Sequence, residues 1–381
     1  MVPLSIGIIG CGNISESYFA GASRSALVRV KACADMHHPA ALARAAQFGV
    51  QAVSVEQLLA DPEIALVINL TIPAAHAGVG RQIIDAGKHL YLEKPLAANW
   101  DDACALVAHA AVRGVRIGCA PDTFLGAAHQ ASRRVLDAGV IGKPVGGAVA
   151  ILSHGMEHWH PNPGFFYKPG GGPLHDMGPY YVTQLVNLLG PVRRVTASAS
   201  IGTPTRTIGS APLRGQLIEV EVATTVNGVL EFDCGANIAL SASWDVWHHQ
   251  RAPIELYGTE GSLSLPDPNF FGGAPQLSRR GAAWESIDIG AHPFGADNRT
   301  LGSGRQVADY RIVGVLDMAA AIADDRPHRA SGALALHVLE VLDGLTQSPL
   351  EGRHVAMMTR CERPAPLPHG AAEDVFLLER A

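Results

Sequence analysis

The chain is poor in charge, in lysine and in long apolar runs. Charged residues make up 17% of its 381 residues, against about 25% in an average soluble protein. It has 5 lysines beside 24 arginines and a net charge of −6, so no basic surface suggests nucleic acid or an anionic membrane as a partner. A long uncharged stretch, residues 177–192, is 16 residues long and contains two Gly-Pro pairs. It is too short and too interrupted to cross a bilayer.

Cysteine pairs are also missing. The six cysteines are scattered and none forms a CxxC motif, which fits neither a zinc ribbon nor a disulfide framework. We therefore expect buried free thiols in a reducing compartment. The N-terminus lacks the positive segment and the small-residue cleavage site of a signal peptide. These absences predict a soluble, cytoplasmic protein.

The chain does have size and apolarity. Hydrophobic residues account for 48% of it, enough to bury a large core, which excludes a disordered protein. A length of 381 residues predicts two domains, or at most three. The 41 glycines and 25 prolines predict many tight turns.

Short β-branched runs alternate with helical patterns up to about residue 121. Strands are predicted over residues 5–10, 28–35, 65–71, 88–95 and 115–121. Helices are predicted between them, one ending at Gly49, one over residues 80–86 and one with Asn99 as its N-cap. This alternation indicates βαβ units and a parallel sheet, an α/β fold.

The pattern changes after residue 121. Helices are predicted over residues 127–138 and 174–189, and a strand over residues 145–152. Residues 192–265 read as strands and turns, with Asn227-Gly228 as a hairpin signal. Residues 266–306 look like a long loop, and helices return at residues 309–323 and 333–346. We expect an α+β domain with a mostly antiparallel sheet.

A glycine motif follows the first predicted strand. Gly10 and Gly12, with Ser15 in place of a third glycine, form G-x-G-x-x-S between a strand and a helix. Gly10 permits a tight turn, Gly12 lets the backbone approach a pyrophosphate, and Ser15 is small enough for close helix packing. The helix N-terminus offers free N–H groups to phosphate. The predicted phosphate loop therefore comprises Gly10, Gly12, Asn13, Ile14 and Ser15.

Asp35 ends the next predicted strand, 23 residues after Gly12. A carboxylate there would accept hydrogen bonds from ribose hydroxyls and repel a 2′-phosphate, so we expect NAD rather than NADP. His37 and His38, just beyond, are compatible with a phosphate. The alternative is a plain surface turn followed by a strand-end aspartate.

Two further motifs lie at the C-terminal ends of predicted parallel strands, the edge at which open α/β sheets bind ligands. Thr71, Pro73 and His76 follow one strand, and Glu93 and Lys94 precede a proline after the next. That proline holds Lys94 in an extended conformation. The alternative for the last two is an ordinary solvated ion pair.

Three glycines precede the helix predicted over residues 174–189. Asp176 and Tyr180 are four residues apart, so both face one side of this helix, and Gln184 extends that side. A carboxylate and a phenol facing a lysine could bind a polyol and move a proton. The alternative is an aspartate that stabilises the helix dipole and a tyrosine in the core.

The order G-x-G-x-x-S, T-x-P-x-x-H, E-K-P and G-G-G-x-x-x-D-x-G resembles that of the glucose-fructose oxidoreductase / inositol dehydrogenase / MocA (Gfo/Idh/MocA) family. The resemblance covers nearly the whole chain, including Ser331-Gly332, Ser348 and Gly352-Arg353 near its end. It implies an N-terminal Rossmann domain, a C-terminal domain with an open antiparallel sheet, and a nicotinamide between them. It also implies redox chemistry at a hydroxyl or ketone of a sugar or cyclitol, and oligomers that pack on the open sheet.

The resemblance also implies roles for single residues. Lys94 would reach the reacting hydroxyl, and Asp176 would bind the substrate. The implied cofactor contacts are Gly10, Gly12, Ser15, Asp35, Thr71, Pro73, His76, Glu93 and Lys94.

Tyr180 departs from the family pattern, because the family's usual proton-accepting histidine stands at this position. A phenol has a reference pKa of about 10, against about 6.5 for imidazole, but a nearby ammonium favours the phenolate. The alternative is that Lys94 is the base and Tyr180 only orients the sugar. His175 lies about 100° away on the helix and is a poor substitute.

A cluster of His154, Glu157, His158 and His160 follows the strand over residues 145–152. We interpret it as a sugar-binding wall, with Trp159 and Tyr167 supplying aromatic faces. A plain structural loop and a metal site are the alternatives, and we expect no metal. Thr123, just past the last Rossmann strand, is expected near the nicotinamide.

The sequence thus predicts an NAD-binding Rossmann domain over residues 1–121, a substrate-binding α+β domain over residues 122–350 and a tail over residues 351–381. We expect an NAD-dependent dehydrogenase that acts on a sugar, glycoside or cyclitol, as a cytoplasmic homodimer or homotetramer. One alternative uses NAD in a redox cycle that cleaves a glycoside. Another is a nucleotide-sensing regulator without activity, which would not need Lys94, Asp176 and Tyr180 together.

Overall fold

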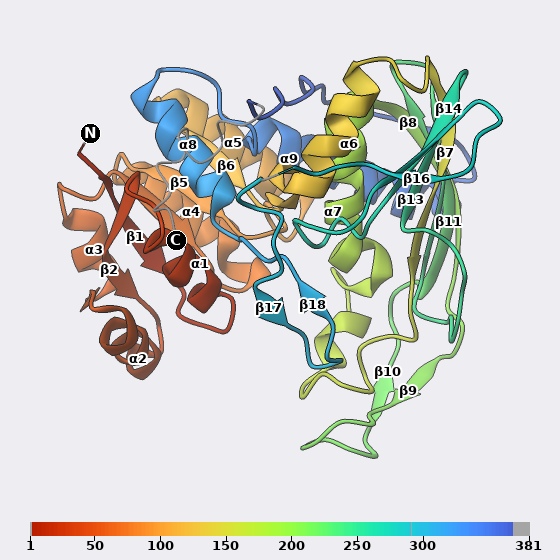
Figure 1. The fold of residues 1–381 in the computed structure, drawn as a ribbon. Helices are drawn as coiled ribbons and strands as arrows, with labels where there is room; N and C mark the ends of the chain where they lie inside the picture. Colours follow the sequence, from red (N-terminus) through yellow and green to blue (C-terminus); the bar gives the residue numbers. More distant parts are fainter. Residues whose placement is uncertain (1, 291, 369–381) are drawn as a thin grey trace.

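The N-terminal part of the protein folds around a six-stranded parallel sheet (Figure 1). The structure, a computed structural model, describes residues 2–290 and 292–368. The strands are β1 (Leu4–Ile9), β2 (Val28–Ala34), β3 (Gln51–Ala52), β4 (Leu66–Asn69), β5 (His89–Leu92) and β6 (Ile117–Cys119). They pair in the order β3-β2-β1-β4-β5-β6, which confirms the predicted Rossmann sheet. The order reverses between β1 and β4, where the ligand crevice of such a sheet lies.

Helices connect these strands. They are α1 (Ser15–Ala22), α2 (His38–Phe48), α3 (Val55–Ala60), α4 (Pro73–Asp85) and α5 (Trp100–Arg113). Gly49 ends α2 in the left-handed conformation, and the side chain of Asn99 accepts the N–H of Asp102 at the start of α5, both as predicted. Helix α4 begins earlier than the predicted residue 80, because Pro73 at the first helical position loses no hydrogen bond.

The C-terminal part is built on an open nine-stranded sheet, at the right of Figure 1. Its order is β16-β15-β14-β13-β7-β12-β11-β8-β19. Among the described residues, β7 and β12 pair in parallel and the other neighbours are antiparallel, as predicted. The strands are β7 (Pro144–Leu152), β8 (Val192–Ser200), β11 (Thr225–Phe232), β12 (Asn237–Ser243), β13 (Ile254–Gly258), β14 (Gly261–Leu265), β15 (Gln276–Arg279), β16 (Glu285–Ser286) and β19 (Val355–Ala356).

Helices fill the space between the two sheets (Figure 1). They include α6 (Ala127–Asp137), α7 (Gly172–Leu189) and α9 (Gly332–Glu351), while α8 (Val313–Ala323) packs on β6. Helix α9 contacts β8 on one side and α5 and β6 on the other. Its Leu339 belongs to the same apolar cluster as Leu106 of α5 and Ile117 of β6. The last long helix therefore completes the core of the first domain.

The hairpin predicted at Asn227-Gly228 is wrong. Both residues lie inside β11, where Gly228 pairs with Leu240 and Ala197 of the neighbouring strands. A Cβ at Gly228 would lie 2.8 Å from Cδ2 of Leu345 in α9, so this glycine makes room for a helix. The turn between β11 and β12 lies at residues 233–236 instead.

The segment before α8 also differs from the prediction. Residues 266–306 are partly sheet, since β15 and β16 extend the nine-stranded sheet and β17 (Arg299–Thr300) pairs with β18 (Gln306–Val307). A second small pair, β9 (Thr205–Thr207) and β10 (Leu217–Glu219), stands apart from the main sheet. The helix expected from residue 309 begins at Val313, because Ile312 has φ +141°, far from helical values.

Three smaller predictions concern the whole chain. The six cysteines are unpaired, as predicted, but Cys234 is exposed and Cys104 half-buried. In the part of the chain that the structure describes, no helix is long and apolar enough to cross a membrane. The domain boundaries stay a prediction, and residues 369–381 of the predicted tail lie outside the described residues.

Candidate functional site

The glycine loop between β1 and α1 has the shape of a phosphate cradle. Gly10 has φ +101°, and a Cβ there would lie 2.6 Å from the carbonyl of Leu70, so only glycine fits. At Gly12 a Cβ would have no neighbour within 4 Å, which leaves the loop open. Among the described residues, the N–H groups of Gly12, Asn13 and Ile14 enter no hydrogen bond. Free N–H groups at a helix N-terminus fit a pyrophosphate.

Asp35 ties this loop to the end of β2. Its Oδ2 accepts the N–H of Cys11 at 2.7 Å, and its Oδ1 accepts the N–H of His37 at 2.7 Å. Arg44, on α2, is a residue that the sequence analysis missed. It donates to Ser15 Oγ at 3.1 Å and pairs with Glu16 at 3.0 Å. The guanidinium of Arg44 therefore lies beside the phosphate loop. Because Arg44 stands within a surface helix and belongs to no motif, the sequence alone does not indicate this contact.

His76 lies under the loops rather than on the surface of the crevice. The ring is fully buried, with Nδ1 at 2.6 Å from the Pro95 carbonyl and Nε2 at 3.0 Å from the Thr71 carbonyl. Burial lowers the pKa of His76, so the neutral ring donates to one carbonyl at a time. His76 therefore holds together the loops that follow β4 and β5, and its direct contact with a cofactor stays a prediction. Pro73 and half-buried Thr71 begin the turn into α4.

Glu93 fixes the loop that carries Lys94. Its Oε1 accepts the hydroxyl of Tyr18 at 2.8 Å, and its Oε2 accepts the N–H of Lys94 at 3.0 Å. Tyr18 is fully buried on α1. Glu93 therefore joins the helix of the phosphate loop to the E-K-P turn, and it is not the solvated partner of the lysine.

Lys94, Asp176 and Tyr180 come together as predicted. The Nζ of Lys94 donates to the carbonyl of Asp176 at 2.6 Å and to its Oδ1 at 3.0 Å, and lies 5.2 Å from the centre of the Tyr180 ring. Burial by itself lowers the pKa of Lys94, but the charges of Asp176 and Tyr180 outweigh it and raise the pKa above the ordinary value. Lys94 is therefore an ammonium at neutral pH. His175 instead reaches Asp343 on α9, at 3.3 Å.

Arg311 is the second residue that the sequence analysis missed. Its Nη2 donates to Asn269 Oδ1 at 2.8 Å and lies 3.4 Å from the hydroxyl of Tyr180. Its Nη1 pairs with Asp309. Arg311 was expected inside a helix, where its position signals nothing; in the structure it lies in the extended segment before α8.

The predicted sugar-binding wall is mostly internal. Tyr167 is fully buried and its hydroxyl donates to Glu157, which also pairs with Arg206 at 3.0 Å. Arg206 pairs in turn with Asp245. Among the described residues, no hydrogen bond or ion pair joins this network to the Lys94 cluster. Both side chains are buried, and substrate binding by Glu157 and Tyr167 stays a prediction.

The other predicted substrate contacts are scattered. His158 and Trp159 are exposed, while the ring of His154 stacks on Trp247 at a centroid distance of 3.3 Å. Thr123 is buried, and its contact with a ligand stays a prediction. Within residues 2–290 and 292–368, no three His, Cys, Asp or Glu side chains are arranged to hold a metal ion.

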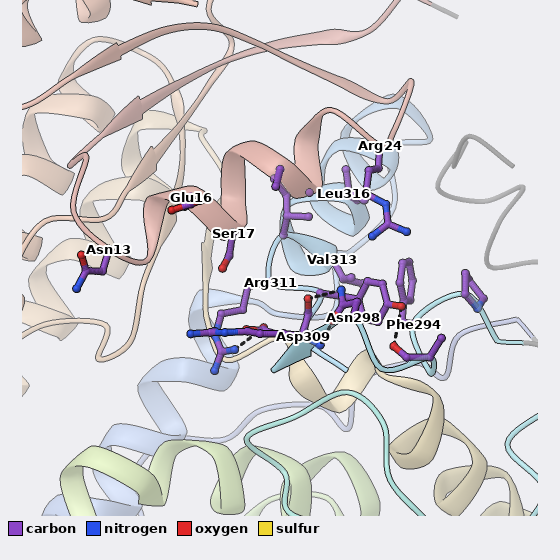
Figure 2. A pocket seen from close by; sticks show the side chains of 17 residues that line it. Asn13, Glu16, Ser17, Arg24, Phe294, Asn298, Asp309, Arg311, Val313 and Leu316 are labelled. Carbon is purple, nitrogen blue, oxygen red and sulfur yellow. Dashed lines mark hydrogen bonds and ion pairs between the residues drawn. The ribbon is translucent and has the colours of Figure 1, made fainter. Parts of the chain in front are cut away.

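A cavity of about 720 Å³ lies between α1 and the segment before α8. Figure 2 shows Asn13 and Ser17 on the α1 side and Arg311 and Asp309 on the facing segment. Gly21 marks where the two walls meet, since a Cβ there would lie 2.4 Å from Cγ2 of Ile312. The cavity therefore has the phosphate loop at one wall and the neighbour of Tyr180 at the other.

Comparisons with known proteins agree with this geometry. Residues 4–120 match the model of the oxidoreductase family with an NAD-binding Rossmann fold. Residues 129–264 match the model of the GFO/IDH/MocA C-terminal domain.

Individual relatives have low sequence identity to this chain but align with most of its length. The chain is 28% identical to 1,5-anhydro-D-fructose reductase of Ensifer adhaerens, over 68% of this chain and 74% of that protein. It is 27% identical to D-xylose 1-dehydrogenase (NADP(+)) 2 of Haloferax volcanii, over 68% and 75%. The crystal structure of an NAD binding oxidoreductase from Klebsiella pneumoniae superposes with a TM-score of 0.79 at 25% identity, covering 94% of this chain and all of that one.

Both parts of the chain therefore match one family across its two domains. The motif order, the Rossmann sheet and the clustered Lys94, Asp176 and Tyr180 agree with those matches. The protein belongs to the GFO/IDH/MocA family of oxidoreductases.

Proposed function

We propose that the protein is an NAD-dependent dehydrogenase acting on a hydroxyl or ketone carbon of a sugar, glycoside or cyclitol. The observation that carries the proposal is the cluster of Lys94, Asp176 and Tyr180 at the carboxyl edge of the Rossmann sheet. Two relatives are named for sugar substrates, 1,5-anhydro-D-fructose and D-xylose, which supports the substrate class.

The phosphate loop and Asp35 fit a dinucleotide. Gly12, Asn13 and Ile14 present free N–H groups at the N-terminus of α1, and Asp35 lies beside them. We propose NAD rather than NADP because a carboxylate disfavours a 2′-phosphate. The nicotinamide, when bound, takes up or supplies a hydride.

Tyr180 is the proposed proton acceptor when an alcohol is oxidised. A proton acceptor must be deprotonated, and the raised pKa of Lys94 keeps that residue an ammonium. Lys94 therefore donates to the reacting oxygen, and the hydroxyl proton passes to the phenolate of Tyr180 as the C–H electron pair leaves for the cofactor. The second carboxylate oxygen of Asp176 is available to a neighbouring sugar hydroxyl, since Lys94 occupies Oδ1.

The direct test is NAD⁺ reduction with panels of aldoses, cyclitols and glycosides, followed by the Tyr180→Phe variant. We expect stoichiometric NADH from at least one substrate. Tyr180→Phe, which keeps the ring, should lower kcat/KM by about 10²–10⁴-fold, the usual size of an acid/base contribution. NADH affinity, measured by fluorescence, should stay within threefold.

Three outcomes contradict this assignment. Release of an aglycone without NADH indicates redox cycling rather than net oxidation. NADH binding with no turnover of any substrate indicates a sensor. A Tyr180→Phe variant within about threefold of wild type, far below the acid/base range, leaves Tyr180 as an orienting residue.

We further propose that the protein is cytoplasmic and self-associates through the nine-stranded sheet. Val145, Val229 and Tyr257, on β7, β11 and β13, are large exposed side chains on these strands, and exposed apolar groups on a sheet favour association. Light scattering should give the mass of a dimer or tetramer, and Val229→Lys should lower it. A monomeric mass in the wild type overturns this proposal.

A further inference from the structure

The segment before α8 is held in an unusual conformation. Ile312 is a buried β-branched residue with φ +141°, a region that such residues occupy only when their surroundings enforce it. The N–H groups of Ile312 and Gly314 donate to Asp122 Oδ2 at 3.2 and 2.8 Å. On the other side, Gly21 of α1 lies against Ile312 so closely that no side chain would fit there. Two separate parts of the chain, Asp122 and helix α1, therefore fix this junction.

This junction fixes the position of the residue before Ile312, Arg311. It is only 11% exposed, and Asp309 and Asn269 hold its guanidinium from two directions. The remaining contact is with Tyr180: the hydroxyl lies 3.4 Å from Nη2, and the guanidinium carbon lies 5.9 Å from the ring centre. A planar guanidinium in a fixed position can direct hydrogen bonds as a flexible ammonium cannot.

The charged groups around Tyr180 also indicate a role for Arg311. Asp309 pairs with both Arg299 and Arg311, so this group of three carries one net positive charge. Lys94 contributes a second cation from another loop, partly balanced by Asp176. Glu93, Asp122 and Asp267 are the other carboxylates that face these cations. Of these charged groups, Lys94 and Arg311 contact the Tyr180 ring itself, and a cation in contact with a phenol favours its charged form.

We propose that Arg311 is a positioning residue for Tyr180: it fixes the direction of the phenol hydroxyl and stabilises the phenolate. The inference rests on the proposed function, because it assigns Arg311 to the proton transfer at Tyr180. Arg311 acts through Tyr180 and needs no contact with the substrate. The strained junction at Ile312 keeps the guanidinium at that distance.

The test compares Arg311→Ala with Arg311→Lys in the full-length protein. Arg311→Ala should lower kcat by about 10²-fold, the lower end for loss of one stabilising donor, with NADH affinity unchanged within threefold. The acidic limb of kcat/KM for alcohol oxidation, along which the general base loses its proton, should move to higher pH, because the phenolate loses a cation. Low-millimolar guanidinium chloride should restore part of the kcat of Arg311→Ala, and Arg311→Lys should fall between the two.

Arg299→Ala is the matched control, because it removes the other partner of Asp309 without touching Tyr180. The Arg299 side chain is half exposed although Asp309 is buried, and the solvated side of an ion pair contributes little, so kcat should fall by less than about fivefold. Tyr180→Phe combined with Arg311→Ala should be no slower than Tyr180→Phe alone, since residues that act as a unit are not additive.

The outcomes separate this inference from the function on which it rests. Absence of NAD⁺ reduction by the wild type, or a harmless Tyr180→Phe, overturns the proposed function. An active wild type with a slow Tyr180→Phe but a normal Arg311→Ala overturns the inference alone, as do fully multiplicative effects in the double variant. If Arg311→Ala does not fold, Asn269→Ala removes the support of Nη2 and should show the same alkaline shift; no shift there overturns the inference.

Discussion

Lys94 and Asp176, 82 residues apart, are joined by two contacts from one ammonium: Nζ to the Asp176 carbonyl at 2.6 Å and to Oδ1 at 3.0 Å. The first contact uses the backbone of α7 and survives any change of the Asp176 side chain. The second sets where the carboxylate points. The lysine is therefore anchored by the helix, and the carboxylate is oriented by the lysine.

Substitutions of Lys94 and of Asp176 should affect different kinetic parameters. Lys94→Ala should lower kcat/KM at least as much as Tyr180→Phe, within about 10²–10⁴-fold, because the reacting oxygen loses its donor. Asp176→Asn should chiefly raise KM, because the amide still accepts from Lys94 but binds sugar hydroxyls less strongly. Steady-state kinetics with each variant check this, and an unchanged KM for Asp176→Asn contradicts the substrate role.

Asp35 should decide between the two dinucleotides. Wild-type protein should bind NADH more tightly than NADPH, since a carboxylate repels the 2′-phosphate. Asp35→Ala should reduce the difference between the affinities for NADH and NADPH. Asp35→Asn is the control for loop shape, because it keeps one oxygen for the N–H groups of Cys11 and His37. Fluorescence titration measures all three, and NADPH binding tenfold tighter in the wild type reverses the assignment.

Glu157 should matter for stability and little for catalysis. Glu157→Ala removes the acceptor of the buried Tyr167 hydroxyl and one of the two carboxylate partners of Arg206, and breaking a buried pair costs about 3–5 kcal/mol. Glu221→Ala is the matched control, because its pair with Lys168 is exposed and worth about 1 kcal/mol or less. Urea unfolding gives both values. A folded Glu157→Ala with normal stability and a raised KM would restore the sugar-wall interpretation.

Metal removal should leave the enzyme active. The chemistry proposed for Lys94 and Tyr180 needs no metal ion, so exhaustive EDTA treatment should not change kcat. Loss of activity that one divalent metal restores, with near-stoichiometric metal by elemental analysis, contradicts this.

Asp122 should make the stability of the protein depend on pH. Burial raises its pKa to about 6, although the N–H groups of Gly314 and Ile312 oppose the shift. The native pKa lies above the unfolded value, so the folded state binds the proton more tightly and loses stability as pH rises from about 4 to about 6. The loss amounts to about 3 kcal/mol for a shift of this size. Asp122→Asn should remove this decline, as urea unfolding across that range can measure; an identical decline in the variant assigns it to other groups.

Local signals in the sequence predict much of the fold. Gly49 and Asn99 act at helix ends through their own conformation and side chain, so their effect can be recognised without the rest of the structure. Gly228 shows the limit of such signals. Its lack of a side chain serves Leu345, more than a hundred residues away, and a sequence pattern cannot distinguish that use from a turn.

The site residues also divide into those that local sequence motifs predict and those that depend on distant parts of the chain. Lys94, Asp176 and Tyr180 are predictable because each lies at a fixed offset from a proline or glycine motif. Arg311 and Arg44 have no such motif, and Arg311 depends on Ile312, whose conformation is imposed by Asp122 and Gly21. Glu157 and Tyr167 have the composition of a binding surface, but both are buried and are hydrogen-bonded to each other. Burial of this kind depends on tertiary packing.

Helix α9 ties the assembly of the first domain to the end of the chain. Leu339 lies in the apolar cluster of β6 and α5, so a fragment ending at residue 121 would leave that surface in water. On the ribosome, the strands of the nucleotide-binding half emerge first, but their outer layer is complete only after α9 has been synthesised. A premature stop codon before residue 332 should therefore yield an insoluble product, even when the nucleotide-binding half has been synthesised completely.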